Sequence, residues 1–481
     1  MRMRGWRLGL LAAGAMTCWG SVATARGGAW IESGDYAALN AVVADSASDT
    51  EKLAAREFAD LWKKVTGRGV YVSNVPYLKT GVIVWIGKEG VPDELLAHVK
   101  PGDLGTDGFC IRTFYLKKVR QGHLAILGGK ERGTMYGVYA FFEDRFGVRF
   151  LAPDFTYIPK KPPTSLPDVD VRYVPPILRR QTTYESYGMQ AYPEDQRAAF
   201  QRHMRWSSSP EFGLFVHTAF TILPPDKYFA EHPDFYSEID GKRVAPVGLD
   251  PNNPAALAQH PELRSQLCFS NPKVAEAIAA ELRPLMQANP KKTNWSVSQM
   301  DWDAHCQCAA CKAINDAEGS PMGSVLTCVN RVADALKAEF PDRYIETLAH
   351  QWSRKPPKTI RPRDNVIVSV CGIDADYARP LYDKKAAIHQ PFADDLAAWS
   401  KVAKNVYIWD YPANCYYAQL PYPDFDVLGP NFAFYAQQNV RGMMLCGGCL
   451  LADDLGALRC YVLSRLMWQP NTQGREHAVS R

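Results

Sequence analysis

The stretch Trp295-Ser296-Val297-Ser298-Gln299, followed directly by Met300-Asp301-Trp302-Asp303, shows the pattern from which we predict the fold. Its first five residues are typical of a short strand, and its last four hold two acids and an aromatic where that strand would end. Short strands that end in polar residues recur along the second part of the chain. We expect them at residues 178–184, 212–217, 265–269, 295–299, 345–349, 366–370, 406–409 and 442–445.

Helical hydrophobic patterns separate most of these strands. They cover residues 195–204, 272–285, 325–339, 392–402, 428–437 and 455–468. Eight strands with intervening helices over about 300 residues are typical of a (β/α)8 TIM barrel, and a doubly wound open sheet is the alternative. We therefore predict an α/β protein in which residues 177–470 form the barrel and residues 471–481 a polar tail.

A smaller α/β sandwich domain is expected before the barrel, at residues 26–158. Helical patterns at 53–65 and 132–146 accompany short strands such as 82–86 and 123–127. Six prolines follow within residues 159–176. Because proline at this density resists both helices and central strands, we predict that this stretch is a linker.

The N-terminus has the features of a signal peptide. Three arginines within residues 2–7 precede the apolar run 8–16, and the small residues Ala23-Thr24-Ala25 follow. The apolar run is too short to span a bilayer. We expect residues 1–25 to be cleaved, and the mature protein to be secreted or periplasmic without attachment to a membrane.

Composition limits the class of partner. The chain has 481 residues, of which 47% are hydrophobic and 22% charged, so it is able to bury a sizeable core. Its formal net charge of +4 becomes nearly neutral without the three leader arginines, which argues against a nucleic-acid-binding protein. Aromatic residues make up 11%, and their rings suit sugars as well as protein cores.

Three aspartates lie where a barrel would carry its reactive groups, at the carboxyl ends of strands. Asp301, Asp374 and Asp410 follow three different expected strands. Glycoside hydrolysis requires two carboxyl groups, one to protonate the leaving oxygen and one to activate water or attack the sugar. An Asp after a strand also commonly caps the next helix, so that alternative stays open for each Asp taken singly.

Aromatic, basic and acidic residues near the same strand ends are candidates for binding the substrate. Trp302, Trp352 and Trp409 have faces on which a pyranose ring could stack. The remaining candidates for substrate binding are Arg180, Glu185, His217, His350 and Tyr411.

The cysteines form one notable cluster. Cys306, Cys308 and Cys311 follow the fourth expected strand as C-x-C-x-x-C, and Cys268 ends the third. Four thiolates would suit a structural zinc ion, whereas export would favour disulfides, and both alternatives stay open. The predicted hydrolysis itself requires no cofactor.

Two sets of motifs resemble known families. Glu131-Arg132-Gly133-Thr134-Met135-Tyr136-Gly137, followed by Gly147-Val148-Arg149-Phe150, is similar to the non-catalytic N-terminal domain of hexosaminidases and alpha-glucuronidases. Gln266-Leu267-Cys268, Ser298-Gln299-Met300-Asp301 and Trp409-Asp410-Tyr411 resemble a secreted bacterial, glycoside-hydrolase-like family of unknown function. The match covers nearly all of the mature chain.

The resemblance implies a hexosaminidase-like α/β domain beside a catalytic barrel, with Asp301 in the place of the acid on strand four. It leads us to expect an exported hydrolase that cleaves O-glycosidic bonds of an oligosaccharide or polysaccharide. Asp301 would be the general acid, with Asp374 or Asp410 as base or nucleophile. Leu445 stands where the family has an acid on strand eight, which favours the alternative of a non-catalytic glycan-binding protein.

Overall fold

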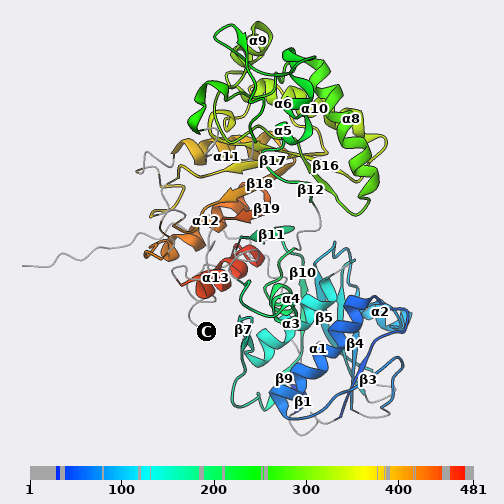
Figure 1. The fold of residues 1–481 in the computed structure, drawn as a ribbon. Helices are drawn as coiled ribbons and strands as arrows, with labels where there is room; N and C mark the ends of the chain where they lie inside the picture. The colour runs from blue at the N-terminus through cyan, green and yellow to red at the C-terminus, as the bar shows by residue number, and fades with distance from the viewer. Residues whose placement is uncertain are drawn as a thin grey trace, which may run out of the picture. The chain divides into compact units, whose positions relative to one another are not determined.

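The computed structural model forms two compact units (Figure 1). Unit 1 combines residues up to 148 with residues 158–174, and unit 2 combines residues 149–157 with those from 175 onward. The expected signal peptide, Glu185 and most of the polar tail lie outside the described residues. The described residues are 29–32, 38–78, 81–116, 121–130, 132–183, 189–207, 212–250, 253, 258–375, 378–383, 385, 390–414, 417, 419–446 and 455–471.

Unit 1 is built on a mixed six-stranded sheet with the order β10-β5-β6-β4-β2-β3. Its strands are β2 (Leu39–Val42), β3 (Tyr71–Ser73), β4 (Val82–Ile86), β5 (Phe109–Leu116), β6 (Gln121–Gly128) and β10 (Asp170–Tyr173). Its helices are α1 (Asp49–Thr66), α2 (Asp93–Val99) and α3 (Gly133–Phe146).

The two faces of this sheet are covered by different helices, because successive side chains of a strand point to opposite faces. In β6, Ala125 and Leu127 share a buried cluster with Leu95 and Val99 of α2. Ile126, between them, lies against Gly137 of α3. The small α/β sandwich expected from the sequence is therefore present.

The stretch expected to be a linker instead contributes two strands to unit 1. β9 (Ser165–Pro167) pairs with β1 (Ala29–Glu32), and β10 pairs with β5 at the edge of the main sheet. Proline is tolerated in such edge positions, where its missing N–H breaks no ladder. The boundary also differs at 149–157, because the hairpin of β7 (Arg149–Ala152) and β8 (Phe155–Tyr157) belongs to unit 2.

Unit 2 is built on a curled, parallel sheet of seven strands in the order β11-β19-β18-β17-β16-β15-β12. This confirms the expected α/β class with a barrel-type sheet, and each strand overlaps one that the sequence predicts. The strands are β11 (Arg179–Thr182), β12 (Phe212–Leu214), β15 (Asn294–Ser296), β16 (Tyr344–Ala349), β17 (Val366–Cys371), β18 (Asn405–Asp410) and β19 (Val440–Leu445).

The third expected strand, at residues 265–269, does not join this sheet. Leu267 makes only an isolated antiparallel bridge with Tyr236, and β12 pairs directly with β15. The backbone of this segment is used by a neighbouring loop, since Ser237 donates its N–H to the Gln266 carbonyl at 2.8 Å. Among the residues that the structure describes, no ladder joins β11 to β12, and the sheet has the form of a half-barrel.

Helices flank the sheet of unit 2 close to their predicted positions, and α8 and α10 pack side by side (Figure 1). They are α4 (Glu194–His203), α8 (Pro272–Ala288), α10 (Met322–Lys337), α11 (Gln390–Val402), α12 (Phe425–Gln437) and α13 (Gly456–Trp468). The loops add α5 (Ala219–Ile222), α6 (Pro225–Tyr228), α9 (Ala309–Glu318), the hairpin β13 (Glu238–Ile239) and β14 (Lys242–Arg243), and 3-10 turns at Pro233–Phe235, Pro261–Leu263 and Gln351–Ser353. Within the described ranges, no helix is both long and apolar enough to cross a membrane.

Candidate active site

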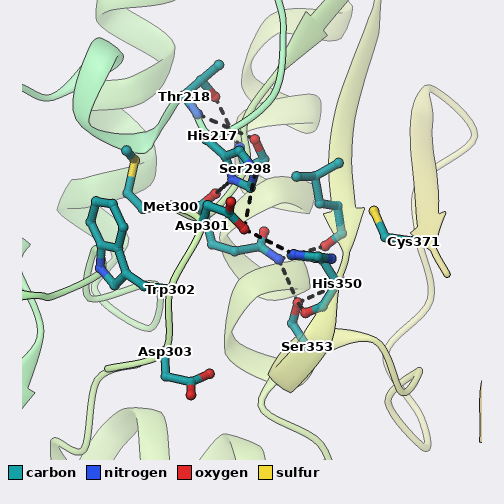
Figure 2. Close-up of polar contacts among 12 residues, drawn as sticks. His217, Thr218, Ser298, Met300, Asp301, Trp302, Asp303, His350, Ser353 and Cys371 are labelled. Atoms are coloured by element: carbon teal, nitrogen blue, oxygen red, sulfur yellow. Dashed lines mark hydrogen bonds and ion pairs between the residues drawn. The ribbon is translucent and has the colours of Figure 1, made fainter. Parts of the chain in front are cut away.

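Three neighbouring strands bring Asp301, His217 and His350 together at their carboxyl ends (Figure 2). His350 directly follows β16, and its Nε2 lies 3.1 Å from Oδ1 of Asp301. His217 follows β12, and its Nε2 lies 3.7 Å from the same oxygen. The side chain of Asp301 is 60% exposed, whereas that of His350 is only 7% exposed. One open carboxylate is thus hydrogen-bonded by the imidazole of His350 and faced by that of His217.

The hydrogen bonds of the two histidines define where their protons sit. Nδ1 of His217 lies 2.8 Å from the Gln299 carbonyl oxygen, which only accepts, so Nδ1 carries the proton in the neutral ring. Nε2 of His217 is then an unprotonated nitrogen that faces Asp301. In His350, Nε2 faces a carboxylate oxygen of Asp301, which only accepts, so the proton lies on Nε2 and is donated to Asp301.

The electrostatics favour a carboxylate at Asp301. The hydrogen bond from His350 lowers the pKa of Asp301, burial opposes this, and His217 lowers it further only when its ring is protonated. Burial lowers the pKa of His217 below the usual histidine value. At neutral pH the site therefore holds an ionised Asp301 beside a neutral His217.

Gln266 holds the loop that carries Asp301, a role that the sequence prediction missed. Its Oε1 accepts the N–H of Met300 at 2.9 Å, and its Nε2 donates to the carbonyls of Met300 at 3.1 Å and Trp302 at 2.6 Å. The side chain is completely buried. The only signal in the sequence is a glutamine beside an apolar run, which gives no hint of a partner more than thirty residues away.

Trp302 lies in this loop and Trp352 lies beside it, and the indole N–H of each forms a hydrogen bond that fixes the loop. Trp302 donates to the Ser265 carbonyl at 2.8 Å, and Trp352 donates to the Trp302 carbonyl at 3.1 Å. The ring of Trp352 stacks on His305, with 5.1 Å between centroids. Both tryptophans are partly exposed, so stacking on a sugar stays a prediction for them.

Asp374 follows β17, so β16 separates its strand from β15, which precedes Asp301. Its carboxylate forms an ion pair with the guanidinium of Arg354, whose Nε binds Asp395 of α11 at 2.9 Å. Burial opposes ionisation of Arg354, but the two aspartates raise its pKa. The side chain of Asp374 is 56% exposed, so its carboxylate is open to a ligand.

Asp410 does not face an open surface, which contradicts its expected role as base or nucleophile. Its exposure is 2%, and its oxygens accept the Tyr435 hydroxyl at 2.8 Å and the Tyr411 N–H at 2.8 Å. Trp409 stacks on Phe215, with 5.5 Å between centroids, so one face is already covered. Tyr411 is partly exposed and stays a candidate for substrate binding.

Arg180 is a structural residue, contrary to its expected role in substrate binding. It is completely buried, and its guanidinium donates to the carbonyls of Arg205 at 2.7 Å and Ile177 at 2.5 Å while lying over the ring of Trp468. Its neighbour Arg179 instead binds Glu346 of β16 at 3.6 Å. Alternation along β11 explains the difference, because adjacent side chains point to opposite faces.

Four cysteines form a second cluster, which could hold a metal ion. The sulfurs of Cys268, Cys306, Cys308 and Cys311 all lie within 4.8 Å of one another, and all four residues are buried. None of the four is paired in a disulfide.

Comparison with known families shows to which family the chain belongs. Residues 150–478 match the model of a family described as "Domain of unknown function (DUF4838)". The chain belongs to this family. Residues 32–141 match a second model, described as "Glycosyl hydrolase family 67 N-terminus". These matches confirm the resemblance to a glycoside-hydrolase-like family of unknown function with a glycoside-hydrolase-type N-terminal domain.

Solved structures that resemble this DUF4838 chain include three glycoside hydrolases. A family GH115 4-O-methyl-alpha-glucuronidase with specificity for decorated arabinogalactans is 9% identical at a TM-score of 0.45, over 89% of this chain and 56% of the enzyme. The family 89 glycoside hydrolase from Clostridium perfringens is 10% identical at a TM-score of 0.44, over 89% of this chain and 49% of the enzyme. The Streptomyces plicatus N-acetyl-beta-hexosaminidase is 11% identical at a TM-score of 0.41, over 90% of this chain and 85% of the enzyme.

This chain therefore spans about half the length of the first two enzymes. Likenesses this distant assign neither an activity nor residue roles to it. No curated protein matches the chain.

Proposed function

We propose that this protein is an exported carbohydrate-active hydrolase that cleaves O-glycosidic bonds of an oligosaccharide or polysaccharide at Asp301. The observation that carries the proposal is the open carboxylate of Asp301, held by His350 at the carboxyl edge of a parallel, barrel-type sheet. The match of the N-terminal residues to a glycosyl hydrolase model supports it.

The electrostatics lead us to revise the role of Asp301. A general acid must carry a proton at working pH, which requires a raised pKa, whereas that of Asp301 is lowered. An ionised carboxylate serves instead as the base that activates water or as the nucleophile that attacks the sugar carbon. In this proposal, His350 is a positioning residue that keeps Asp301 ionised and oriented.

Asp374 is the second carboxyl group in this mechanism, since it is the other predicted aspartate with an open side chain. To protonate a leaving oxygen it would have to give up its ion pair with Arg354. Arg354 also binds Asp395, so the guanidinium keeps a partner when that pair breaks. We propose that substrate binding loosens the Arg354–Asp374 pair and lets Asp374 act as the acid.

The test is a screen for sugars released from uronic-acid, hexosamine and neutral glycans by the wild type, Asp301→Asn and Asp303→Asn. Asp303 is the matched control because its carboxylate lies apart from the Asp301 cluster (Figure 2). We expect Asp301→Asn to slow release about 10²–10⁴-fold and Asp303→Asn to stay close to the wild type. Equal rates for Asp301→Asn and the wild type would refute the assignment.

A second candidate is a glycan-binding protein without turnover. Two observations favour it. Asp410 is buried, and Leu445 is buried and has no proton to transfer. Calorimetry that detects glycan binding, combined with no released sugar after long incubation, would select this alternative.

A further inference from the structure

The four clustered cysteines come from two segments that are distant in the sequence. Cys268 lies two residues after Gln266. Cys306 and Cys308 lie in the loop after Asp301, and Cys311 lies in the first turn of α9. The Cys268 sulfur is 3.7 Å from that of Cys308 and 3.9 Å from that of Cys311. The cluster therefore joins the two segments that meet around Asp301.

These distances match the geometry of a tetrahedral zinc site. With Zn–S bonds of about 2.3 Å, the sulfurs at two corners of the tetrahedron lie about 3.8 Å apart. A disulfide would instead need a sulfur–sulfur distance of about 2.05 Å. Two pairs near the tetrahedral value, with all four sulfurs within 4.8 Å, place four soft ligands around one central point.

The surroundings of the cluster suit the negative charge of four thiolates around a divalent ion. The N–H of Glu238 points to the Cys306 sulfur at 3.3 Å, and Nη1 of Arg243 lies 3.5 Å from the same sulfur. The Ser270 hydroxyl oxygen is 3.0 Å from the Cys311 sulfur. Such outer partners orient metal ligands and offset their charge.

We propose that Cys268, Cys306, Cys308 and Cys311 bind one zinc ion in a closed structural site. Four protein sulfurs fill the tetrahedron, so no position is left for water or substrate, and the ion has no catalytic role. Its effect is to clamp the loop after Asp301 onto the segment of Gln266 and the β13–β14 hairpin. The proposal is independent of the hydrolase activity.

The test measures metal in the full-length protein, purified without chelators, added metal or reductant. Elemental mass spectrometry should find about one zinc per chain, and exchange for Co²⁺ should give the visible absorption of tetrahedral thiolate coordination. The double variant Cys306→Ser/Cys308→Ser should retain less than about a tenth of the zinc. Cys110→Ser, which changes a buried cysteine of β5 in unit 1, should retain all of it.

The wild-type measurement decides the question even if the double variant fails to fold. A protein without zinc whose four cysteines resist alkylation until reduced holds disulfides, and this overturns the proposal. A protein without zinc whose four thiols are all alkylated overturns it as well. Equal loss of zinc from Cys110→Ser would place the metal elsewhere.

Discussion

At the scale of single residues, the candidate site depends on the side chains that surround the carboxylate of Asp301 and set its charge. His350 is nearly buried and donates its Nε2 proton to Asp301, whereas the unprotonated Nε2 of His217 faces the same oxygen without donating to it. The hydrogen bond from His350 is the largest influence that lowers the pKa of Asp301. The charge state of Asp301 is thus set mainly by one partner.

Replacing His350 should therefore change the titration of Asp301. In His350→Ala the pKa of Asp301 should rise, so the acidic limb of the kcat/KM profile should move to higher pH. His350→Gln, which keeps an N–H donor, should restore part of the shift. A profile of His350→Ala that matches the wild type on the acidic side would contradict a positioning role.

Gln266 offers a test at the same scale that needs no substrate. Gln266→Ala removes the hydrogen bonds that this side chain makes to the loop and leaves the buried N–H of Met300 without its acceptor, which should cost roughly 2–4 kcal/mol in the free energy of unfolding. Gln307→Ala is the control, because this exposed glutamine accepts one hydrogen bond, from the Asp240 N–H. Urea unfolding should separate the two variants, and equal losses would show that Gln266 does not hold the loop.

At the scale of elements, strands such as β16 and β17 were predictable because each is a largely apolar run with polar residues soon after it. The failure at 265–269 has a physical cause, since a β-prone run becomes a strand only if its backbone finds a neighbouring ladder. Here the Gln266 backbone binds Ser237 and its side chain binds the Asp301 loop. Such partners are set by tertiary structure and cannot be read from local pattern.

The same limit explains which site residues were predictable. His217, Asp301 and His350 meet because the carboxyl ends of neighbouring parallel strands share one edge of the sheet. The roles predicted for Arg180 and Asp410 were wrong because the sequence does not say toward which face of a strand a side chain points. A shift of one residue along the strand exchanges the two faces.

In β6, a buried histidine should make unit 1 sensitive to acid. Burial lowers the pKa of His123 to about 4, and its Nδ1 accepts the Trp85 indole N–H at 3.1 Å. Between pH 6.5 and 4 the unfolded chain binds this proton and the folded chain does not, so stability falls as the pH falls. After allowing for solvent screening, the loss should be about 2 kcal/mol.

His123→Gln keeps an acceptor for Trp85 but does not titrate in this range. Denaturant unfolding of unit 1, followed at pH 7 and pH 4, should therefore show a smaller acid-induced loss in this variant than in the wild type. An equal loss in both proteins would rule out His123 as the source.

At the scale of the whole molecule, the main difference from the sequence prediction is the division of the chain. Proline content predicts a linker at 159–176, yet β9 and β10 pair within unit 1, and Leu166 and Val169 are buried there. Proline density reports where helices and central strands are excluded, and edge strands satisfy that restriction as well as a linker does.

This division predicts how fragments of unit 1 behave. A fragment of residues 29–174 keeps both edge strands, whereas 29–158 loses them together with Leu166 and Val169. The shorter fragment should be less stable by about 3–5 kcal/mol for the two buried side chains alone. Circular dichroism melts should show a cooperative transition for the longer fragment at higher temperature, and equal melting temperatures would favour the linker.

The central claim, that the ionised Asp301 attacks or activates the attack on a glycosidic bond, is tested most directly by chemical rescue. Asp301→Ala should release sugar about 10²–10⁴-fold more slowly than the wild type. Added azide, a small nucleophile that fits the vacated space, should restore turnover and yield a glycosyl azide. Wild-type rates in Asp301→Ala without azide would contradict the claim.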